Sequence, residues 1–122
     1  MERRIYLIVE AMGPVAEDLR MTVEEFDPGA LGRVAPSPDA GLAIAGAERI
    51  SVAFVHADPT EFEATQLGRM LHAQGTTIIF MGDRAEERAE AGQHVLLRPF
   101  GAESVAQTLR PLLQTGAAGP NG

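Results

Sequence analysis

The chain alternates short apolar runs with longer amphipathic segments, and this alternation constrains the fold more than any other feature. The apolar runs lie within the segments 4–11, 30–37, 52–58, 76–82 and 94–100. Near-continuous apolar runs rich in β-branched residues are typical of strands that are covered on both faces. Strict alternation of such strands with helices predicts an α/β fold, in which a five-stranded parallel sheet lies between two layers of helices.

The helix boundaries are indicated by capping residues. Ser37 precedes Pro38, which suits a first helical turn. Thr60 and Glu63 have the spacing of a capping box, and Gly75 is a typical C-terminal residue, so we expect one continuous helix between them. The expected helices are 14–26, 37–47, 59–75, 83–92 and 101–113.

The length of 122 residues suits one domain with one core. We expect this domain to cover residues 1–114, because the segment 115–122 (TGAAGPNG) has almost no side chains to bury and is predicted to be a disordered tail. We expect no output domain after the last helix, so any effect of the chain is expected to pass through a partner.

Composition excludes several classes of function. The net charge of −7 argues against a nucleic-acid partner and against binding to anionic membranes. The absence of cysteine excludes disulfides and thiolate chemistry. No stretch reaches the roughly 18 apolar residues of a membrane span. The first apolar run is short and contains Glu10, so we interpret it as a strand and not a signal peptide, and expect a cytoplasmic protein.

Polar residues follow the apolar runs at the positions where parallel α/β sheets bind ligands, outside the carboxyl ends of the strands. The residues at these strand ends are Glu10, His56, Asp58, Gly82, Asp83 and Arg98.

Four segments, LIVEAMGPVAEDL, VAFVHADP, IIFMGD and LLRPF, resemble the successive landmarks of response-regulator receiver domains, and the resemblance covers most of 4–114. It implies a flavodoxin-like fold and a role in two-component signal transduction or a phosphorelay. Receivers accept a phosphoryl group on an aspartate after the third strand, and an acidic pair after the first strand holds magnesium. A hydroxyl residue after the fourth strand and a lysine before a proline after the fifth contact the phosphoryl oxygens.

Most of these family positions are replaced in this chain. Glu10 keeps the first acidic position, and Pro99 and Phe100 stand as in the family. The resemblance also implies a cis bond before Pro99. The replaced positions are Ala11 for the second acidic residue, His56 for the acceptor, Gly82 for the hydroxyl residue and Arg98 for the lysine.

His56 is placed ahead of Asp58 as the equivalent of the acceptor. Residues two apart along a strand point to the same side but differ in depth. The apolar run ends at Val55, so His56 is the first residue at the strand end, and Pro59 already begins the next helix. Asp58 is therefore expected on the loop.

The replacements argue against phosphoryl chemistry. Magnesium needs several oxygen ligands, and Ala11 and His56 supply no carboxylate, so no cofactor or metal is expected. We predict instead that Glu10 pairs with Arg98, whose guanidinium can bind a carboxylate bidentately, and that His56 is hydrogen-bonded to one of the two.

We interpret the chain as an atypical, non-phosphorylatable receiver-like module (a pseudo-receiver) without enzymatic activity, which acts by protein–protein interaction. The resemblance implies a histidine kinase, a phosphotransfer protein or another signalling protein as partner. It also implies contact through the face formed by 83–92, 94–98 and 102–113, where we expect weak homodimerisation.

Three alternatives stay open. The chain is a working phosphoreceiver if Asp58 accepts the phosphoryl group and Glu10 and Asp83 hold magnesium. His56 is itself a candidate acceptor, since imidazoles carry phosphoryl groups in histidine kinases. A small ligand-binding or enzymatic flavodoxin-like domain requires a deep pocket at the strand ends, where the sequence indicates only small residues.

Overall fold

The computed structural model describes residues 3–98 and 100–114, and it contains a five-stranded parallel sheet with the strand order β2-β1-β3-β4-β5. This is the flavodoxin-like order, so the predicted fold class is confirmed. The strands are β1 (Ile5–Val9), β2 (Leu31–Ala35), β3 (Val52–His56), β4 (Thr77–Met81) and β5 (His94–Val95).

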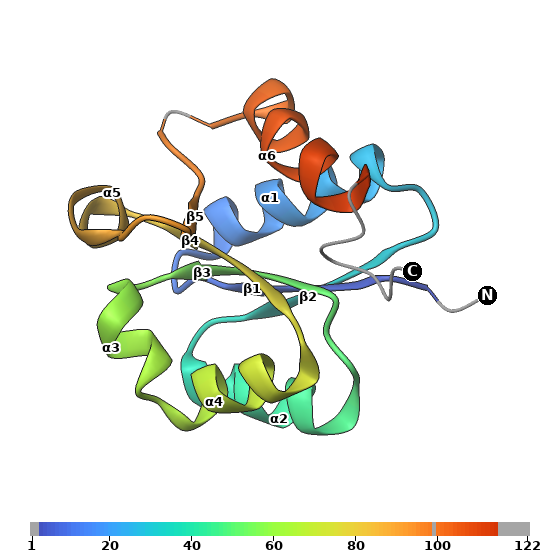
Figure 1. The fold of residues 1–122 in the computed structure, drawn as a ribbon. Helices are drawn as coiled ribbons and strands as arrows, with labels where there is room; N and C mark the ends of the chain where they lie inside the picture. Colours follow the sequence, from blue (N-terminus) through green and yellow to red (C-terminus); the bar gives the residue numbers. More distant parts are fainter. Residues whose placement is uncertain (1–2, 99, 115–122) are drawn as a thin grey trace.

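Helices cover both faces of this sheet (Figure 1). The helices α1 and α6 pack on one face, and α2, α3 and α4 lie on the other. The described helices are α1 (Gly13–Phe26), α2 (Pro38–Ala47), α3 (Pro59–Glu63), α4 (Gln66–Gln74), α5 (Asp83–Arg88) and α6 (Ala102–Gln114).

Two apolar cores result from the alternation of side chains along the strands. In β1, Tyr6 and Ile8 belong to the core under α1 and α6, whereas Leu7 and Val9 belong to the core under α2 and α4. Burial on both faces explains why the strands are read in the sequence as continuous apolar runs.

Two of the predicted helix boundaries are confirmed. The hydroxyl of Ser37 accepts a hydrogen bond from the backbone N–H of Ala40 at the start of α2. Gly75 ends α4 in the left-handed conformation with a φ of 79°, which a residue without a Cβ adopts at little cost.

The continuous helix predicted for 59–75 is wrong, because the segment forms two helices. Asp58, and not Thr60, is the N-cap of α3. Thr65 interrupts the segment and caps α4, since its hydroxyl donates to the carbonyl of Phe62 at 2.6 Å and accepts from the N–H of Gly68 at 3.0 Å. A Cβ on Gly68 would lie 2.3 Å from the carbonyl oxygen of Phe62, so glycine permits this close turn.

The fifth strand and the helix before it are shorter than predicted. β5 has two residues, and α5 ends at Arg88 and not at Gly92. The backbone N–H of Arg98 donates to the carboxylate of Glu86 at 3.2 Å, so this part of the chain is held by a side chain and does not extend the sheet.

The predicted cis bond before Pro99 and the predicted tail 115–122 lie outside the described residues. Within the described ranges, none of the helices has the length and apolar character that crossing a bilayer demands.

Candidate functional site

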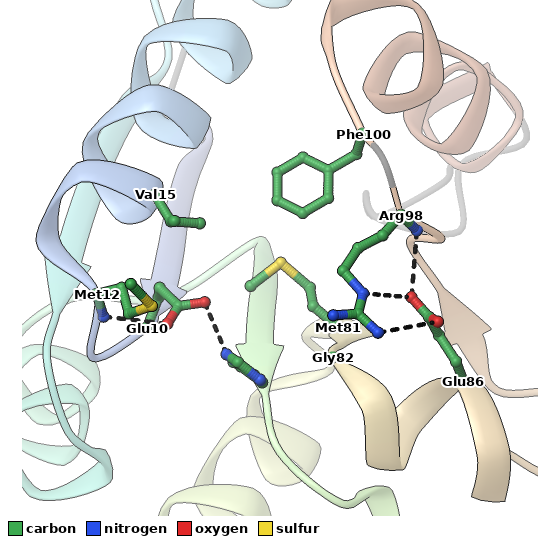
Figure 2. A pocket seen from close by; sticks show the side chains of 9 residues that line it. Glu10, Met12, Val15, Met81, Gly82, Glu86, Arg98 and Phe100 are labelled. Carbon is green, nitrogen blue, oxygen red and sulfur yellow. Dashed lines mark hydrogen bonds and ion pairs between the residues drawn. The ribbon is translucent and has the colours of Figure 1, made fainter.

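A cavity of about 630 Å³ lies at the carboxyl ends of the strands. It is near the switch point between the neighbouring strands β1 and β3, from which the chain adds β2 on one side and β4 and β5 on the other. Ligands bind at this switch point in other open α/β sheets. Figure 2 shows the cavity from close by. Its described lining residues are Glu10, Met12, Val15, His56, Met81, Gly82, Glu86, Arg98 and Phe100.

Glu10 and His56 form a hydrogen-bonded pair on one wall of this cavity. Glu10 is 5% exposed, and its Oε1 lies 2.8 Å from Nδ1 of His56. Its Oε2 accepts the backbone N–H of Met12 at 3.1 Å, just before α1 begins. The expectation that His56 is hydrogen-bonded to Glu10 or Arg98 is therefore confirmed, with Glu10 as the partner.

Gly82 lies against the ring of His56. A Cβ built on Gly82 would be 2.3 Å from Cδ2 and 2.4 Å from Nε2 of the imidazole, far inside normal contact distance. Gly82 also has a φ of 99° and a ψ of 173°, a backbone conformation almost restricted to glycine. The imidazole thus occupies the space that a side chain at position 82 would need.

Arg98 lines the opposite wall, and its partners are Asp83 and Glu86 at the start of α5. Its Nε donates to Oε2 of Glu86 at 3.1 Å, and its Nη2 forms an ion pair with Asp83 (the Glu86 contacts are drawn in Figure 2). Hydrogen bonding to Arg98 lowers the pKa of the Glu86 carboxyl and raises that of the guanidinium.

The predicted pair between Glu10 and Arg98 is therefore wrong. Both carboxylate oxygens of Glu10 are already hydrogen-bonded, to His56 and to the backbone of Met12. The backbone N–H of Arg98 is hydrogen-bonded to Glu86, and this bond holds Arg98 beside the acidic first turn of α5.

Asp58 does not line the cavity, although it is close in sequence to His56. It is 5% exposed, and its Oδ1 accepts the N–H groups of Thr60 at 2.9 Å and Glu61 at 3.2 Å. Its Oδ2 lies 3.4 Å from Nη1 of Arg88 and 4.0 Å from Nη1 of Arg84. Asp58 is thus a buried helix cap with basic neighbours.

Ala11 is exposed and is not among the described residues that line the cavity. The structure therefore brings together four of the six predicted pocket residues, namely Glu10, His56, Gly82 and Arg98.

The sequence interpretation missed the apolar part of the cavity. Met12, Val15, Met81 and Phe100 contribute large side chains, so the expectation of small residues alone at the strand ends is wrong. Figure 2 shows Val15, Met81 and Phe100 in the space between Glu10 and Arg98. The register of β3 and β4 pairs His56 with Met81. The predicted sheet therefore offered one signal for this apolar part, because it ends both strands at the same edge.

The residues present do not fit a magnesium ion, which the resemblance to receiver domains implies. A hard divalent cation needs several oxygen ligands. Glu10 is the only carboxylate on its wall of the cavity among the described residues, and Asp83 and Glu86 are paired with Arg98. No described group of three or more histidines and carboxylates has an arrangement that would hold a metal ion.

Comparison with known proteins gives matches of structure alone. No family model and no curated protein matches this chain. The structure is similar to SdrG from Sphingomonas melonis Fr1, with a TM-score of 0.67 and 20% identity over 93% of this chain and 99% of that one.

Two further similar structures carry receiver names. The chemotaxis response regulator CheY4 of Vibrio cholerae has a TM-score of 0.66 and 17% identity, over 91% of this chain and 99% of that one. The signal receiver domain of a DNA-binding response regulator from Colwellia psychrerythraea has a TM-score of 0.67 and 16% identity, over 91% and 98%. At these identities the likeness concerns the fold: the chain has the flavodoxin-like fold of response-regulator receiver domains.

Proposed function

We propose that this chain is an atypical receiver-like module of a two-component-type signalling system, which acts through protein–protein contacts and neither accepts a phosphoryl group nor binds magnesium. The observation that carries the proposal is the Glu10–His56 hydrogen bond of 2.8 Å at the carboxyl ends of β1 and β3. In the receivers that this chain resembles, these positions hold a magnesium ligand and the acceptor aspartate.

The proposal follows from what phosphoryl transfer requires. Transfer to a carboxylate depends almost wholly on positioning and on neutralising the charge of the phosphoryl oxygens. Glu10 has both oxygens occupied, Gly82 offers no hydroxyl, and two carboxylates already neutralise Arg98. The charges that would stabilise an anion are therefore engaged within the protein.

Asp58 is a poor alternative acceptor in this geometry. Its Oδ1 accepts two backbone N–H groups of α3, and the whole residue is 5% exposed. Phosphorylation at Asp58 would break the N-cap of α3 and would place a further charge in a nearly closed site. This site is outside the cavity that Glu10 lines. The two exposed arginines beside Oδ2 favour an anion, which is why the Asp58→Asn variant belongs in the test.

The test is incubation with acetyl phosphate, with and without magnesium, followed by intact mass spectrometry. The native chain is expected to keep its mass, while a phosphorylatable receiver treated in parallel gains one phosphoryl group. Magnesium-dependent labelling that Asp58→Asn abolishes would establish the working phosphoreceiver. Labelling that is lost in His56→Ala would show that the imidazole is the acceptor. Either result would overturn the proposal.

The proposed contact surface is the face formed by α5, β5 and α6, through which we propose both partner binding and weak self-association. Leu97, which follows β5, is 62% exposed and gives this face an apolar contact point. Met21 on α1 is 50% exposed and lies on a different element, so it provides a matched control.

Sedimentation analysis over a range of concentrations tests this part of the proposal. Self-association is expected for the native chain and for Met21→Ser, and it should weaken in Leu97→Ser. A strict monomer at the highest concentration, or equal weakening in both variants, would rule out this face as the self-contact.

A further inference from the structure

The cavity at the strand ends combines an apolar interior with two side-chain nitrogens that no described residue hydrogen-bonds, Nε2 of His56 and Nη1 of Arg98. Its volume of about 630 Å³ is within the range of small-molecule sites, roughly 300–1,000 Å³. Met12, Val15, Met81 and Phe100 supply the apolar surface. Met12 remains 61% exposed, so a large apolar side chain stands uncovered at this site. An occupant that covers this surface would be stabilised by removing it from water.

Among the described residues, the polar side chains of the cavity are bonded to one another, and the two nitrogens left over are Nε2 of His56 and Nη1 of Arg98. Glu10 is bonded to His56 and Met12, and Arg98 and Glu86 are bonded to each other. The Nδ1 of His56 is used by Glu10, and no described residue hydrogen-bonds its Nε2. Because a carboxylate accepts the proton on Nδ1, the Nε2 of the neutral ring carries a lone pair and is an acceptor.

The charges in the cavity favour a neutral occupant over an anion. Glu10 and Glu86 are both acidic, and the guanidinium of Arg98 is shared between Glu86 and Asp83. An anionic ligand would face these carboxylates without an unpaired cation on the described walls. A neutral group that donates one hydrogen bond to Nε2 meets no such repulsion.

We infer that the cavity binds a neutral aromatic group that carries one hydrogen-bond donor, such as a phenol or an indole. The ring lies against Met81, Val15 and Phe100, and its O–H or N–H donates to Nε2 of His56. Aromatic rings make favourable contacts with the sulfur of methionine and with other rings. Such a group can be a free small molecule or a tyrosine or tryptophan side chain of a partner. This inference goes beyond the proposed signalling role and does not depend on it.

The test uses para-cresol and its methyl ether as probes, because the ether keeps the ring and removes the donor. Binding to the full chain is followed by amide NMR at mildly alkaline pH. Para-cresol is expected to shift the amides of Met12, Val15 and Gly82, and to bind about 2- to 10-fold more tightly than the ether. N-acetyltyrosine amide, tested in parallel, distinguishes the sources: equal binding supports a partner side chain, and selective binding of para-cresol supports a small molecule.

Three variants complete the experiment. His56→Leu replaces the imidazole by an apolar side chain of similar size, and this variant should lose the preference for the phenol. His72→Leu, on the exposed side of α4, is the matched control and should keep it. Met12→Ser removes exposed apolar surface and leaves the hydrogen bond between Glu10 and His56 in place. It should therefore weaken the binding of both probes, and it keeps the test valid even if His56→Leu does not fold. Equal binding of the ether, shifts centred elsewhere, no binding at all, or unchanged binding in Met12→Ser would overturn the inference.

Discussion

Replacing Gly82 by alanine should destabilise the chain through two separable effects, and this makes the substitution the most informative single change. The first effect is backbone strain. The φ of 99° and ψ of 173° at Gly82 belong to a region that costs a residue with a Cβ about 1–3 kcal/mol. The second effect is a collision, because the new Cβ would lie 2.3 Å from Cδ2 of His56.

The collision has a defined energetic consequence. The imidazole is 48% exposed, so it can rotate into solvent. It then loses its hydrogen bond to Oε1 of Glu10. Glu10 is 5% exposed, and leaving a buried polar atom without its partner costs about 1–3 kcal/mol. Gly82→Ala alone should therefore lower the free energy of unfolding by about 2–6 kcal/mol.

A double-mutant cycle with His56→Ala separates the two effects. In the His56→Ala background the collision is absent and the hydrogen bond is already lost, so Gly82→Ala should cost only the strain. The expected coupling energy is about 1–3 kcal/mol, measured by urea denaturation of the four proteins with closely similar m-values. Additivity within about 0.5 kcal/mol would show that the imidazole does not occupy the space at position 82, and would refute this reasoning.

Three further predictions concern other hydrogen-bonded groups of the chain. Burial, followed by the hydrogen bond to Asp27, raises the pKa of Tyr6 above its ordinary 10.0, so the stability that the neutral phenol contributes is present below that pH and is lost as the pH rises above it. Tyr6 is the only tyrosine and the chain has no tryptophan, so tyrosinate absorbance reports this group alone; ionisation near pH 10 in the folded chain would contradict the prediction. Asp58→Ala should lower the free energy of unfolding by about 0.5–2 kcal/mol and Asp58→Asn by less, because asparagine also caps helices; equal losses in thermal unfolding would argue against the capping role. Glu10→Gln and Arg98→Met should have additive effects on stability, since the two side chains have different partners, and a coupling near 1 kcal/mol would reinstate their pairing.

The fold was predictable because its causes are local and repeated along the chain. The apolar runs specify strands that are buried on both faces, and Ser37 and Gly75 mark helix ends by chemistry that needs no tertiary contact. The break before α4 was missed for the opposite reason. Thr60 and Glu63 satisfy a capping pattern, but the buried carboxylate of Asp58 caps the helix instead, and Thr65 starts the next one.

The candidate site was predictable in position and less so in pairing. Strand ends in a parallel sheet locate Glu10, His56, Gly82 and Arg98 at one edge, and the cavity contains all four. Which carboxylate Arg98 reaches depends on where β5 stops and on the backbone bond to Glu86, and no periodicity encodes either feature. The sequence also gives the absence of a hydroxyl at Gly82, whereas the reason, the nearby imidazole, is visible only in three dimensions.

Binding of beryllofluoride in the presence of magnesium tests the central claim most directly, because this complex mimics a phosphoryl group on an aspartate. Fluorine NMR of the native chain should show only free fluoride species, at concentrations that saturate a phosphorylatable receiver. A bound resonance that requires magnesium, together with shifts of the Glu10 and His56 amides, would contradict the account and show that these strand ends still hold an anion and a metal.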